Sequence, residues 1–343
     1  GARAMTGAAP GFADVHGFQP LLRAFGRARR AKRGKGGEPA FYRDLEGNLL
    51  RLSAALAART WRPAPYRYFT LTNKKRRVVS EAAFPDRVVH HALVAAIEPL
   101  WEPRFIDQSY ACRKGRGVHA AVRRAAVLSR QHRFYLRLDV NRYFDHVDHA
   151  ALLGLLEERI ADEGVHWLCR AILAHAAVPQ VPAGARRGIP IGNLTSQFWA
   201  NVYLDPLDHA LAALVGAPRV LRYMDDVLVF ADDKATLWEV AQVAGELCAD
   251  RLQLTLKRKA TAVAPVTEGL PWLGFRVFPG TVRVERYGRR RYGRRLRASS
   301  RRAAISPLAE AAEVGRMASA AGHLAHADTL ALRRDMLRRA AAG

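Results

Sequence analysis

Apolar residues recur at two spacings along the chain, and each spacing predicts a different element. A return every third or fourth position predicts an amphipathic helix, whereas alternation with polar residues, or a short apolar run, predicts a strand. Helices are predicted at residues 42–59, 86–100, 119–128, 148–159, 165–176, 196–214, 236–248 and 307–342, and strands at 66–72, 134–140, 252–256 and 269–277, with a pair of strands inside 221–230. No internal repeat is found, and the mixture predicts an α+β fold.

Residues 221–230 read LRYMDDVLVF and place two adjacent acids, Asp225 and Asp226, between two short apolar runs. The pattern predicts a strand, a tight turn and a second strand, with the acids at the tip. Adjacent carboxylates repel each other, so a nearby positive charge should offset their closeness. Oxygen ligands at a rigid turn suit Mg²⁺. The alternative is a hairpin whose turn is acidic only because Asp favours turns.

A third acid, Asp139, ends the apolar strand predicted at 134–140. An acid at the end of a buried strand is costly unless it has a function. If this strand and the acidic hairpin are neighbours, Asp139 converges with Asp225 and Asp226. Two-metal phosphoryl transfer requires such a cluster of carboxylates.

The formal net charge is +24, from 55 basic and 31 acidic residues. This excess is larger than solubility requires and predicts a polyanionic partner, most simply nucleic acid. Basic groups gather at residues 27–35, 74–77, 113–116 and 286–302. Tyr287 and Tyr292 interrupt the last run, a combination that fits a single-stranded or hybrid nucleic acid backbone.

Two of these basic runs have an ordinary interpretation as well. Run 27–35 is either an arm that orders on a phosphate backbone or a solvated tail. Lys75 and Arg77 share one face of an extended chain. Two cations on one face suit a triphosphate, but lysine and arginine also protect exposed edge strands.

The three cysteines, Cys112, Cys169 and Cys248, lie far apart and show no metal-ligand spacing. Their odd number argues against a disulfide framework and for a reducing compartment. No apolar run approaches the roughly 18 residues of a membrane span, and the first ten residues do not resemble a signal peptide. We therefore expect a cytoplasmic protein with no membrane partner.

In their order along the chain, these motifs resemble those of reverse transcriptases. Residues 223–226 resemble the YxDD box, and Asp139 with Phe144 resembles the first acidic motif, D-x-x-x-x-F. The loop 192–196 resembles the G-x-x-x-S segment between them. Further similarities lie in two later palm motifs, at 256–257 and 272–275, and in the fingers of group II intron-like bacterial enzymes, at 86–89 and 109–110. The ordered set spans about residues 65–280.

The resemblance implies a right-hand polymerase with fingers, palm and thumb. The expected divisions are a basic amino-terminal arm at 1–40, fingers at 41–135, a palm at 136–281 with a fingers insertion at about 160–187, and a basic helical thumb at 282–343. The expected activity is RNA-directed DNA polymerisation, a nucleotidyl transfer that uses two Mg²⁺ ions, template RNA, a cDNA or primer end, and dNTPs.

Two departures narrow the resemblance, because Ile191 and Gln197 stand where most of the family has Gln and Pro. Together with the segments 76–78 and 86–91, they resemble reverse transcriptases of diversity-generating retroelements. That family copies a template-repeat RNA with errors opposite adenine, and the cDNA then replaces a variable repeat. It also implies a partner, a small basic accessory variability protein that forms a ring.

Other functions remain open at this stage. A retron or defence-associated reverse transcriptase would share the same motifs. A basic RNA-binding scaffold could keep the fold without polymerisation, although the intact trio Asp139, Asp225 and Asp226 argues against it.

The resemblance also implies roles for single residues. Asp139 and Asp225 would ligate the two Mg²⁺ ions, with Asp226 in support and the Val140 carbonyl as a further ligand. The expected nucleotide contacts are Lys75, Arg77, Phe144, Ile191, Gly192, Gln197 and Lys257. The expected primer or template contacts are Tyr223, Met224, Arg113, Lys114, Arg116, Trp272 and Gly274.

Within this set, Phe144 would exclude a 2′-hydroxyl, and Lys257 would donate a proton to pyrophosphate. The ordinary alternatives are a core aromatic and a surface lysine. Ile191 and Gly192 would flank the templating pair, and the aliphatic Ile191 offers no hydrogen bond to position it. His90, His91 and His119 are interpreted as helix or packing residues.

Overall fold

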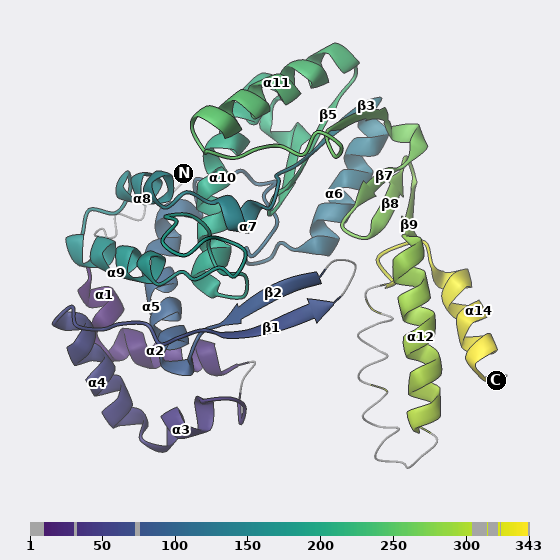
Figure 1. Cartoon of the computed structure of the whole chain (residues 1–343). Coiled ribbons are helices and arrows are strands. Elements are labelled where there is room, and N and C mark those ends of the chain that lie inside the picture. The colour runs from purple at the N-terminus through teal and green to yellow at the C-terminus, as the bar shows by residue number, and fades with distance from the viewer. Residues whose placement is uncertain are drawn as a thin grey trace, which may run out of the picture.

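The computed structural model describes residues 10–30, 33–72, 76–303 and 324–341, together with Val314 and Gly322. The fold combines helices with antiparallel sheets, as an α+β fold predicts (Figure 1). A helical block lies at one end, a four-stranded sheet lies in the middle, and two basic helices lie at the other end. Among the described residues, no helix is long and apolar enough to cross a membrane.

The helical block is built around α5, a long helix with an apolar face. It contains α1 (Ala13–His16), α2 (Phe18–Arg29), α3 (Glu38–Arg43), α4 (Leu45–Ala57) and α5 (Phe84–Trp101). Leu21 and Phe25 of α2 are buried and belong to the same apolar cluster as Val88 and Leu93 of α5. Because this contact removes apolar surface from water, it fixes α2 to the body of the protein.

The expectation of a separate basic arm over residues 1–40 is therefore wrong for the described part of that segment. Residues 18–29 form a helix with a buried apolar stripe, and Arg23, Arg27 and Arg30 lie on its exposed side. The basic run concealed a period of three to four in the apolar residues, which is the pattern of a packed helix.

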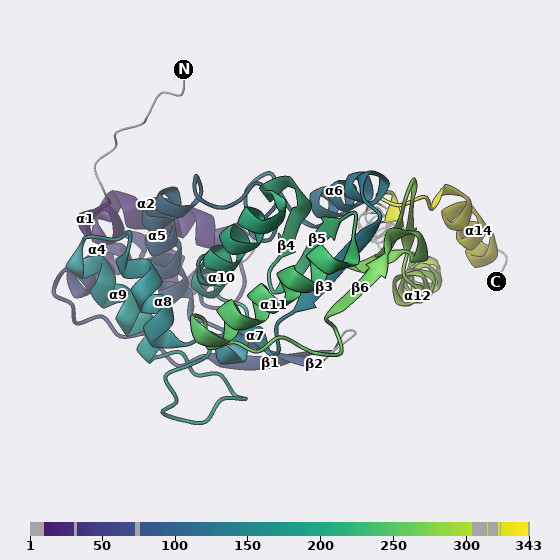
Figure 2. The ribbon, with the colours of Figure 1, turned by 90° about the horizontal axis from the view of Figure 1, so that it is seen from above.

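The central sheet has the strand order β4-β5-β3-β6, and every pair is antiparallel. Its strands are β3 (Phe134–Asp139), β4 (Val220–Tyr223), β5 (Asp226–Ala231) and β6 (Ala262–Pro265). Leu136 and Val229 point into the cluster that also contains residues of α10 (Leu194–Val215) and α11 (Lys234–Asp250). Figure 2 shows these two helices lying along the sheet.

The opposite face of the sheet is also covered. Tyr135 and Phe230, the alternate residues of β3 and β5, join a second apolar cluster with α6 (Val118–Gln131) and the small sheet of β7 (Leu270–Trp272), β8 (Phe275–Phe278) and β9 (Thr281–Val284). Because both faces are buried, a one-residue slip would exchange every side chain between them, so the register at the acids is strongly specified.

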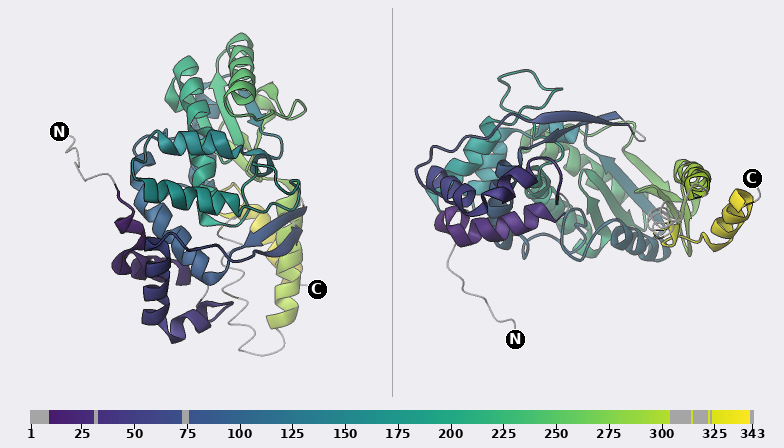
Figure 3. Two further views of the ribbon diagram at one scale, coloured as in Figure 1. Left: turned by 60° about the vertical axis from the view of Figure 1, so that its left-hand side comes forward. Right: turned by 90° about the horizontal axis from the view of Figure 1, so that it is seen from below.

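The remaining elements surround the sheet. They are the hairpin of β1 (Arg67–Thr72) and β2 (Arg76–Glu81), the helices α7 (Tyr143–His146), α8 (His149–Glu157), α9 (Glu163–Ala174), α12 (Arg286–Ala303) and α14 (Leu330–Ala341), and the short helices η1 (Ala217–Arg219) and η2 (Val266–Glu268). The β1–β2 hairpin extends from the helical block toward α12 (Figure 1), and Figure 3 shows the same arrangement from two further sides.

One predicted strand is absent. Residues 252–256 alternate in burial as predicted but form only an isolated bridge, between Leu256 and Val140. Gln253 adopts a φ of 52°, in the left-handed region, which interrupts an extended chain.

Candidate active site

Two strands of the central sheet bring the three predicted acids together. In the register of β3 with β5, Asp139 is the partner of Asp226. Asp225 lies in the tight turn between β4 and β5, where Met224 has a φ of 55°. Opposite residues of an antiparallel pair have Cβ atoms about 5 Å apart, so the backbone places Asp139 and Asp226 side by side although 87 positions (226 − 139) separate them in sequence.

Two of the three carboxylates are held by cations. The Lys257 ammonium donates to Asp139 Oδ1 at 2.7 Å. Arg137 donates from Nε and Nη2 to the two oxygens of Asp226 at 2.9 and 2.8 Å. Among the described residues, no group of three or more His, Cys, Asp and Glu side chains has the geometry to hold a metal ion. The acids are therefore neighbours, but the side chains of Asp139 and Asp226 are turned toward cations of the protein.

Burial raises the pKa of Asp225 above its usual range, and the nearby Asp139 raises it further, while Lys257 and Arg77 act in the opposite direction. Burial likewise raises the pKa of Asp226, which stays raised in spite of the opposing ion pair with Arg137. The negative charge at this edge of the sheet is thus only partly compensated. Oxygen donors with uncompensated charge are the ligand chemistry that Mg²⁺ prefers, so the donor set fits a divalent cation.

A buried arginine supports the acidic turn from beneath. Arg222 and Asp208 are both fully buried, and the Arg222 guanidinium donates to both Asp208 oxygens at distances from 2.7 to 2.9 Å. It also donates to the Asn201 side chain at 2.9 Å and to the Met224 carbonyl at 3.2 Å. Local sequence patterns did not predict this network, although an arginine inside an apolar strand next to two acids is a usable signal.

The loop before α10 is bonded to the β1–β2 hairpin. The Ser80 N–H donates to the Ile191 carbonyl at 2.8 Å. Gly192 has a φ of 116°, and a Cβ at this position would lie 2.7 Å from Val79 Cγ1 and 3.0 Å from the Ser80 carbonyl oxygen. Only glycine fits there. Ile191 and Gly192 are therefore held against β2, and Gln197 lies half-buried in the first turn of α10.

The other predicted nucleotide contacts lie around the same place. Arg77 is exposed on β2 and close enough to Asp225 to lower the pKa of that carboxyl. Phe144 is half-buried, with its ring centroid 5.4 Å from that of Tyr143. The predicted backbone ligand Val140 is buried and follows Asp139 directly. Lys75 lies outside the described residues.

Two of the predicted primer or template contacts, Arg113 and Trp272, have buried side chains. Arg113 is buried, where its guanidinium binds the Glu102 carboxylate and donates to the carbonyls of Ile106 and Ser109. Trp272 is fully buried in the second apolar cluster. Both side chains have partners within the fold. Arg113 donates to buried acceptors, and Trp272 packs against apolar neighbours.

The other predicted contacts keep an accessible surface. Lys114 and Gly274 are exposed, and Arg116 is half-buried beside Asp107, with 2.9 Å between Nη2 and Oδ1. Tyr223 and Met224 are half-buried at the acidic turn. Gly274 has a φ of 87° in the turn between β7 and β8, a conformation that favours glycine.

The basic helix α12 is amphipathic. Arg290, Arg294 and Arg297 are exposed, whereas Tyr292 and Leu296 are buried in the second apolar cluster. Tyr292 therefore packs into the protein, while these arginines face solvent.

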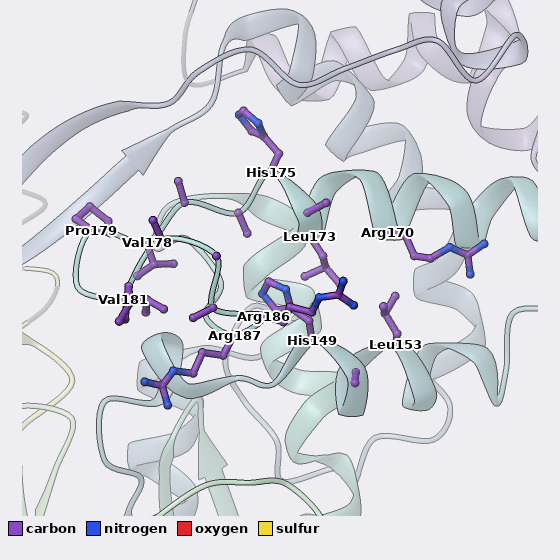
Figure 4. Close-up of a pocket in the computed structure, with 18 of the residues that line it drawn as sticks. His149, Leu153, Arg170, Leu173, His175, Val178, Pro179, Val181, Arg186 and Arg187 are labelled. Atoms are coloured by element: carbon purple, nitrogen blue, oxygen red, sulfur yellow. The ribbon is translucent and has the colours of Figure 1, made fainter.

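The segment 160–187, predicted as an insertion, encloses a separate hollow of about 1080 Å³ between α8, α9 and the loop that follows α9. Figure 4 shows His149 and Arg186 among the residues that line it, together with apolar side chains such as Leu153 and Leu173. It does not include any of the three acids.

Comparisons with known proteins add a family to this geometry. A family model described as reverse transcriptase (RNA-dependent DNA polymerase) matches residues 69–277, more than half of the 343 residues. The matched segment contains the three acids, most of the β1–β2 hairpin and the loop before α10.

Individual relatives agree with that match. Protein YkfC of Escherichia coli is 27% identical over 271 residues, which cover 67% of this chain and 70% of YkfC. The group II intron-encoded protein LtrA of Lactococcus lactis is 28% identical over 167 residues, 48% of this chain and 28% of LtrA. Among solved structures, telomerase of Candida albicans has a TM-score of 0.47 at 12% identity, covering 66% of this chain and 46% of the telomerase chain.

Proposed function

Because this chain belongs to the reverse transcriptase family of RNA-directed DNA polymerases, we propose that the edge of the sheet at Asp139, Asp225 and Asp226 is its centre for nucleotidyl transfer. The observation that supports this most directly is the pairing of Asp139 with Asp226 across two strands, with Asp225 in the adjoining turn. The cationic surroundings of the acids suit a substrate with phosphate groups on both the primer and the nucleotide.

Asp139 and Asp225 would hold two Mg²⁺ ions, with Asp226 in support and the Val140 carbonyl beside them. When bound, such ions polarise the attacking 3′-oxygen and stabilise the leaving pyrophosphate. Lys257 and Arg137 occupy two of the carboxylates in the present arrangement. Both cations can therefore offset the negative charge of the buried acids before the substrate binds. An uncompensated buried charge would destabilise the fold.

Lys257 and the cations of the β1–β2 hairpin would act on the nucleotide when it is present. Arg77, on the exposed hairpin, would bind the triphosphate, as would Lys75. Lys257, close to the reacting centre, would give a proton to the departing pyrophosphate. Phe144 follows the strand end and would pack under the sugar, where a ring excludes a 2′-hydroxyl and favours dNTPs.

We further propose that the enzyme belongs to a diversity-generating retroelement and copies a template-repeat RNA with errors opposite adenine. The support is the resemblance at Ile191, Gln197 and segment 86–91. An aliphatic side chain at position 191 supplies no hydrogen bond to the templating pair, so the pair is positioned less firmly. The resemblance also implies the ring-forming accessory variability protein as a partner.

A second candidate is a reverse transcriptase of the group II intron type. It is favoured by the names of the relatives, which include an intron-encoded protein in Lactococcus lactis and a nuclear intron maturase in Arabidopsis thaliana. The two candidates predict different error spectra on the same template.

Primer extension on a defined RNA template, with dNTPs and Mg²⁺, tests both the proposed active centre and the proposed retroelement origin. DNA synthesis supports the active centre, and errors concentrated opposite adenine support the retroelement. Ile191→Gln should lower the error rate opposite adenine while leaving errors at other bases unchanged. An even and low error rate in the wild type, unaffected by Ile191→Gln, would favour the intron type instead.

A further inference from the structure

Arg137 binds one of the three acids through two of its nitrogen atoms. It lies two residues before Asp139 on β3, so both side chains project from the same face of the sheet. Its register partner on β5 is Leu228, and Asp226 is its diagonal neighbour. Diagonal positions of an antiparallel pair lie about 7–8 Å apart, a distance that a long side chain can span. Nε and Nη2 of Arg137 therefore reach both oxygens of Asp226, at 2.9 and 2.8 Å.

The two ion pairs of the centre differ in what they leave open. Lys257 donates one bond, to Oδ1 of Asp139, and leaves the other oxygen of that carboxylate unbound to the lysine. Arg137 faces both oxygens of Asp226. A bidentate guanidinium fixes the orientation of a carboxylate more firmly than a single ammonium does. A divalent ion that approached Asp226 would also meet the positive charge of the guanidinium.

The surroundings of Arg137 strengthen its pair with Asp226. The Arg137 side chain is 29% exposed and that of Asp226 is 18% exposed, and charges partly removed from water attract each other more strongly. Burial alone would lower the pKa of Arg137, but Asp226 raises it, and Asp139 and Glu285 raise it further. Because Arg137 has these other acids nearby, loss of the Asp226 charge would not leave it an isolated buried cation.

Asp225 is held differently. It lies in the turn between β4 and β5, and none of the described side chains donates a hydrogen bond to it, while Lys257 and Arg77 act on it through their charge. Asp225 and Asp139 thus offer oxygen atoms that no cation of the described chain covers, whereas both oxygens of Asp226 face Arg137.

We propose that Arg137 is a positioning residue that keeps Asp226 out of the metal-binding set, so that Asp139 and Asp225 alone supply the side-chain ligands. The inference rests on the proposed function, because it concerns the ions of that centre. Each added carboxylate reduces the net positive charge of a metal site, and with it the polarisation of the attacking oxygen. Arg137 therefore favours catalysis at the expense of ion affinity.

The first test measures binding of Mn²⁺, used in place of Mg²⁺, to the protein without nucleic acid or nucleotide. The electron paramagnetic resonance signal of free Mn²⁺ reports the bound fraction. Arg137→Met should tighten binding about tenfold or more, the order by which a cation within about 4–6 Å changes the affinity of a carboxylate for positive charge. Adding Asp226→Asn removes the released ligand and should return the affinity to near the wild-type value. Arg251→Met, which breaks an exposed pair with Glu158, is the control and should bind like the wild type.

The second test is primer extension with the same variants. Arg137→Met should lower kcat severalfold while the KM for dNTP stays unchanged, and adding Asp226→Asn should recover most of kcat. Arg137→Lys keeps the charge without the bidentate contact, so its kcat should lie between those of the wild type and Arg137→Met. Tighter ion binding together with slower catalysis is a combination that a merely structural role does not predict.

The double variant also guards against a folding defect, because removing both partners of a polar pair costs less than removing one. If the wild type makes no DNA and Asp225→Asn leaves its Mn²⁺ binding unchanged, the proposed function fails. If the wild type is active but Arg137→Met binds Mn²⁺ with wild-type affinity, or if Asp226→Asn does not reverse the gain, only the present inference is overturned.

Discussion

The acidic edge of the sheet and the β1–β2 hairpin both belong to the proposed centre for nucleotidyl transfer but are built in opposite ways. Five of the six residues of β5 are buried, whereas all six residues of β1 are exposed. The acids thus lie on a strand fixed by core on both faces, and Arg77 lies on a two-stranded ribbon. A two-stranded hairpin is marginally stable by itself, so the hairpin depends on its attachments at Ile191 and Gly192.

This difference predicts that the two regions have different roles in the proposed reaction. Groups that hold metal ions and reacting atoms must be preorganised within a fraction of an ångström. Groups that grip a triphosphate must also let the pyrophosphate leave, and an exposed hairpin can move for that purpose. Four changes would test how far the two regions differ.

The largest effect is expected at the fixed region. Asp139→Asn or Asp225→Asn should reduce primer extension about 10³-fold or more, because a lost metal ligand removes several kcal/mol of transition-state stabilisation. Single-turnover kinetics with saturating dNTP and Mg²⁺ would measure the loss. The folded state can be verified by circular dichroism. Synthesis at the wild-type rate in both variants would mean that chemistry occurs elsewhere.

The support beneath the turn should show a large effect on stability. Arg222→Met leaves Asp208 buried without a partner and should lower the free energy of unfolding by about 3–5 kcal/mol. Adding Asp208→Leu should recover much of that loss. Arg51→Met is a matched control, since its ion pair with Asp44 is exposed and such pairs contribute little to stability. Urea denaturation would compare them, and equal losses for Arg222→Met and Arg51→Met would contradict the assignment.

The attachment of the hairpin should show an intermediate effect. In Gly192→Ala, the new Cβ would meet Val79 and Ser80, so β2 must shift, at a cost of about 1–3 kcal/mol. We expect a raised KM for dNTP from the displaced hairpin. Gly280→Ala has a similar positive φ but open space around its Cβ, so it separates backbone strain from the contact. A KM raised equally in both variants would exclude the contact as the cause.

The smallest effect concerns pH. The pKa of Asp225 is raised in the fold by burial, so its favourable contribution is present in acid and is lost as the pH rises through the raised value. Without divalent ions, Asp225→Asn should therefore be more stable than wild type at neutral pH, and the gain should vanish below the ordinary Asp value of 3.8. Asp233→Asn is a control, because the pKa of Asp233 is lowered by its bonds to Thr236. Thermal unfolding across pH would show a gain for the first variant alone.

Local patterns in the sequence predicted most of the elements and the meeting of the acids. Helix α10 and strands β3 and β5 each show the hydrophobic periodicity of their element within a single segment. The positions of the acids follow from the predicted strands. The predictions failed where a side chain's surroundings come from distant parts of the chain. Arg113 is positively charged and lies in a glycine-rich loop, but Glu102 and two carbonyls enclose it. Nothing within its own segment encodes that enclosure.

The prediction of a basic amino-terminal arm failed for a related reason. Composition suggested a tail, but the apolar side of α2 has a partner in α5, encoded about 65 residues later. The surroundings of His90 also lie beyond any local pattern, because a histidine within a helix predicts a packing residue. The helix does bury His90, but burial left both ring nitrogens without partners among the described residues.

The hydrogen bonds of Arg222 have a consequence for the substitutions that this position can accept during evolution. Its backbone is bonded to Gln108 and Tyr110, and its side chain joins Asp208, Asn201 and the Met224 carbonyl. Lysine would offer a single point of charge in place of five directed donors. A substitution of Arg222 would require several of its partners to be replaced at the same time. Position 222 should therefore tolerate fewer substitutions than neighbouring positions whose side chains contact only apolar groups.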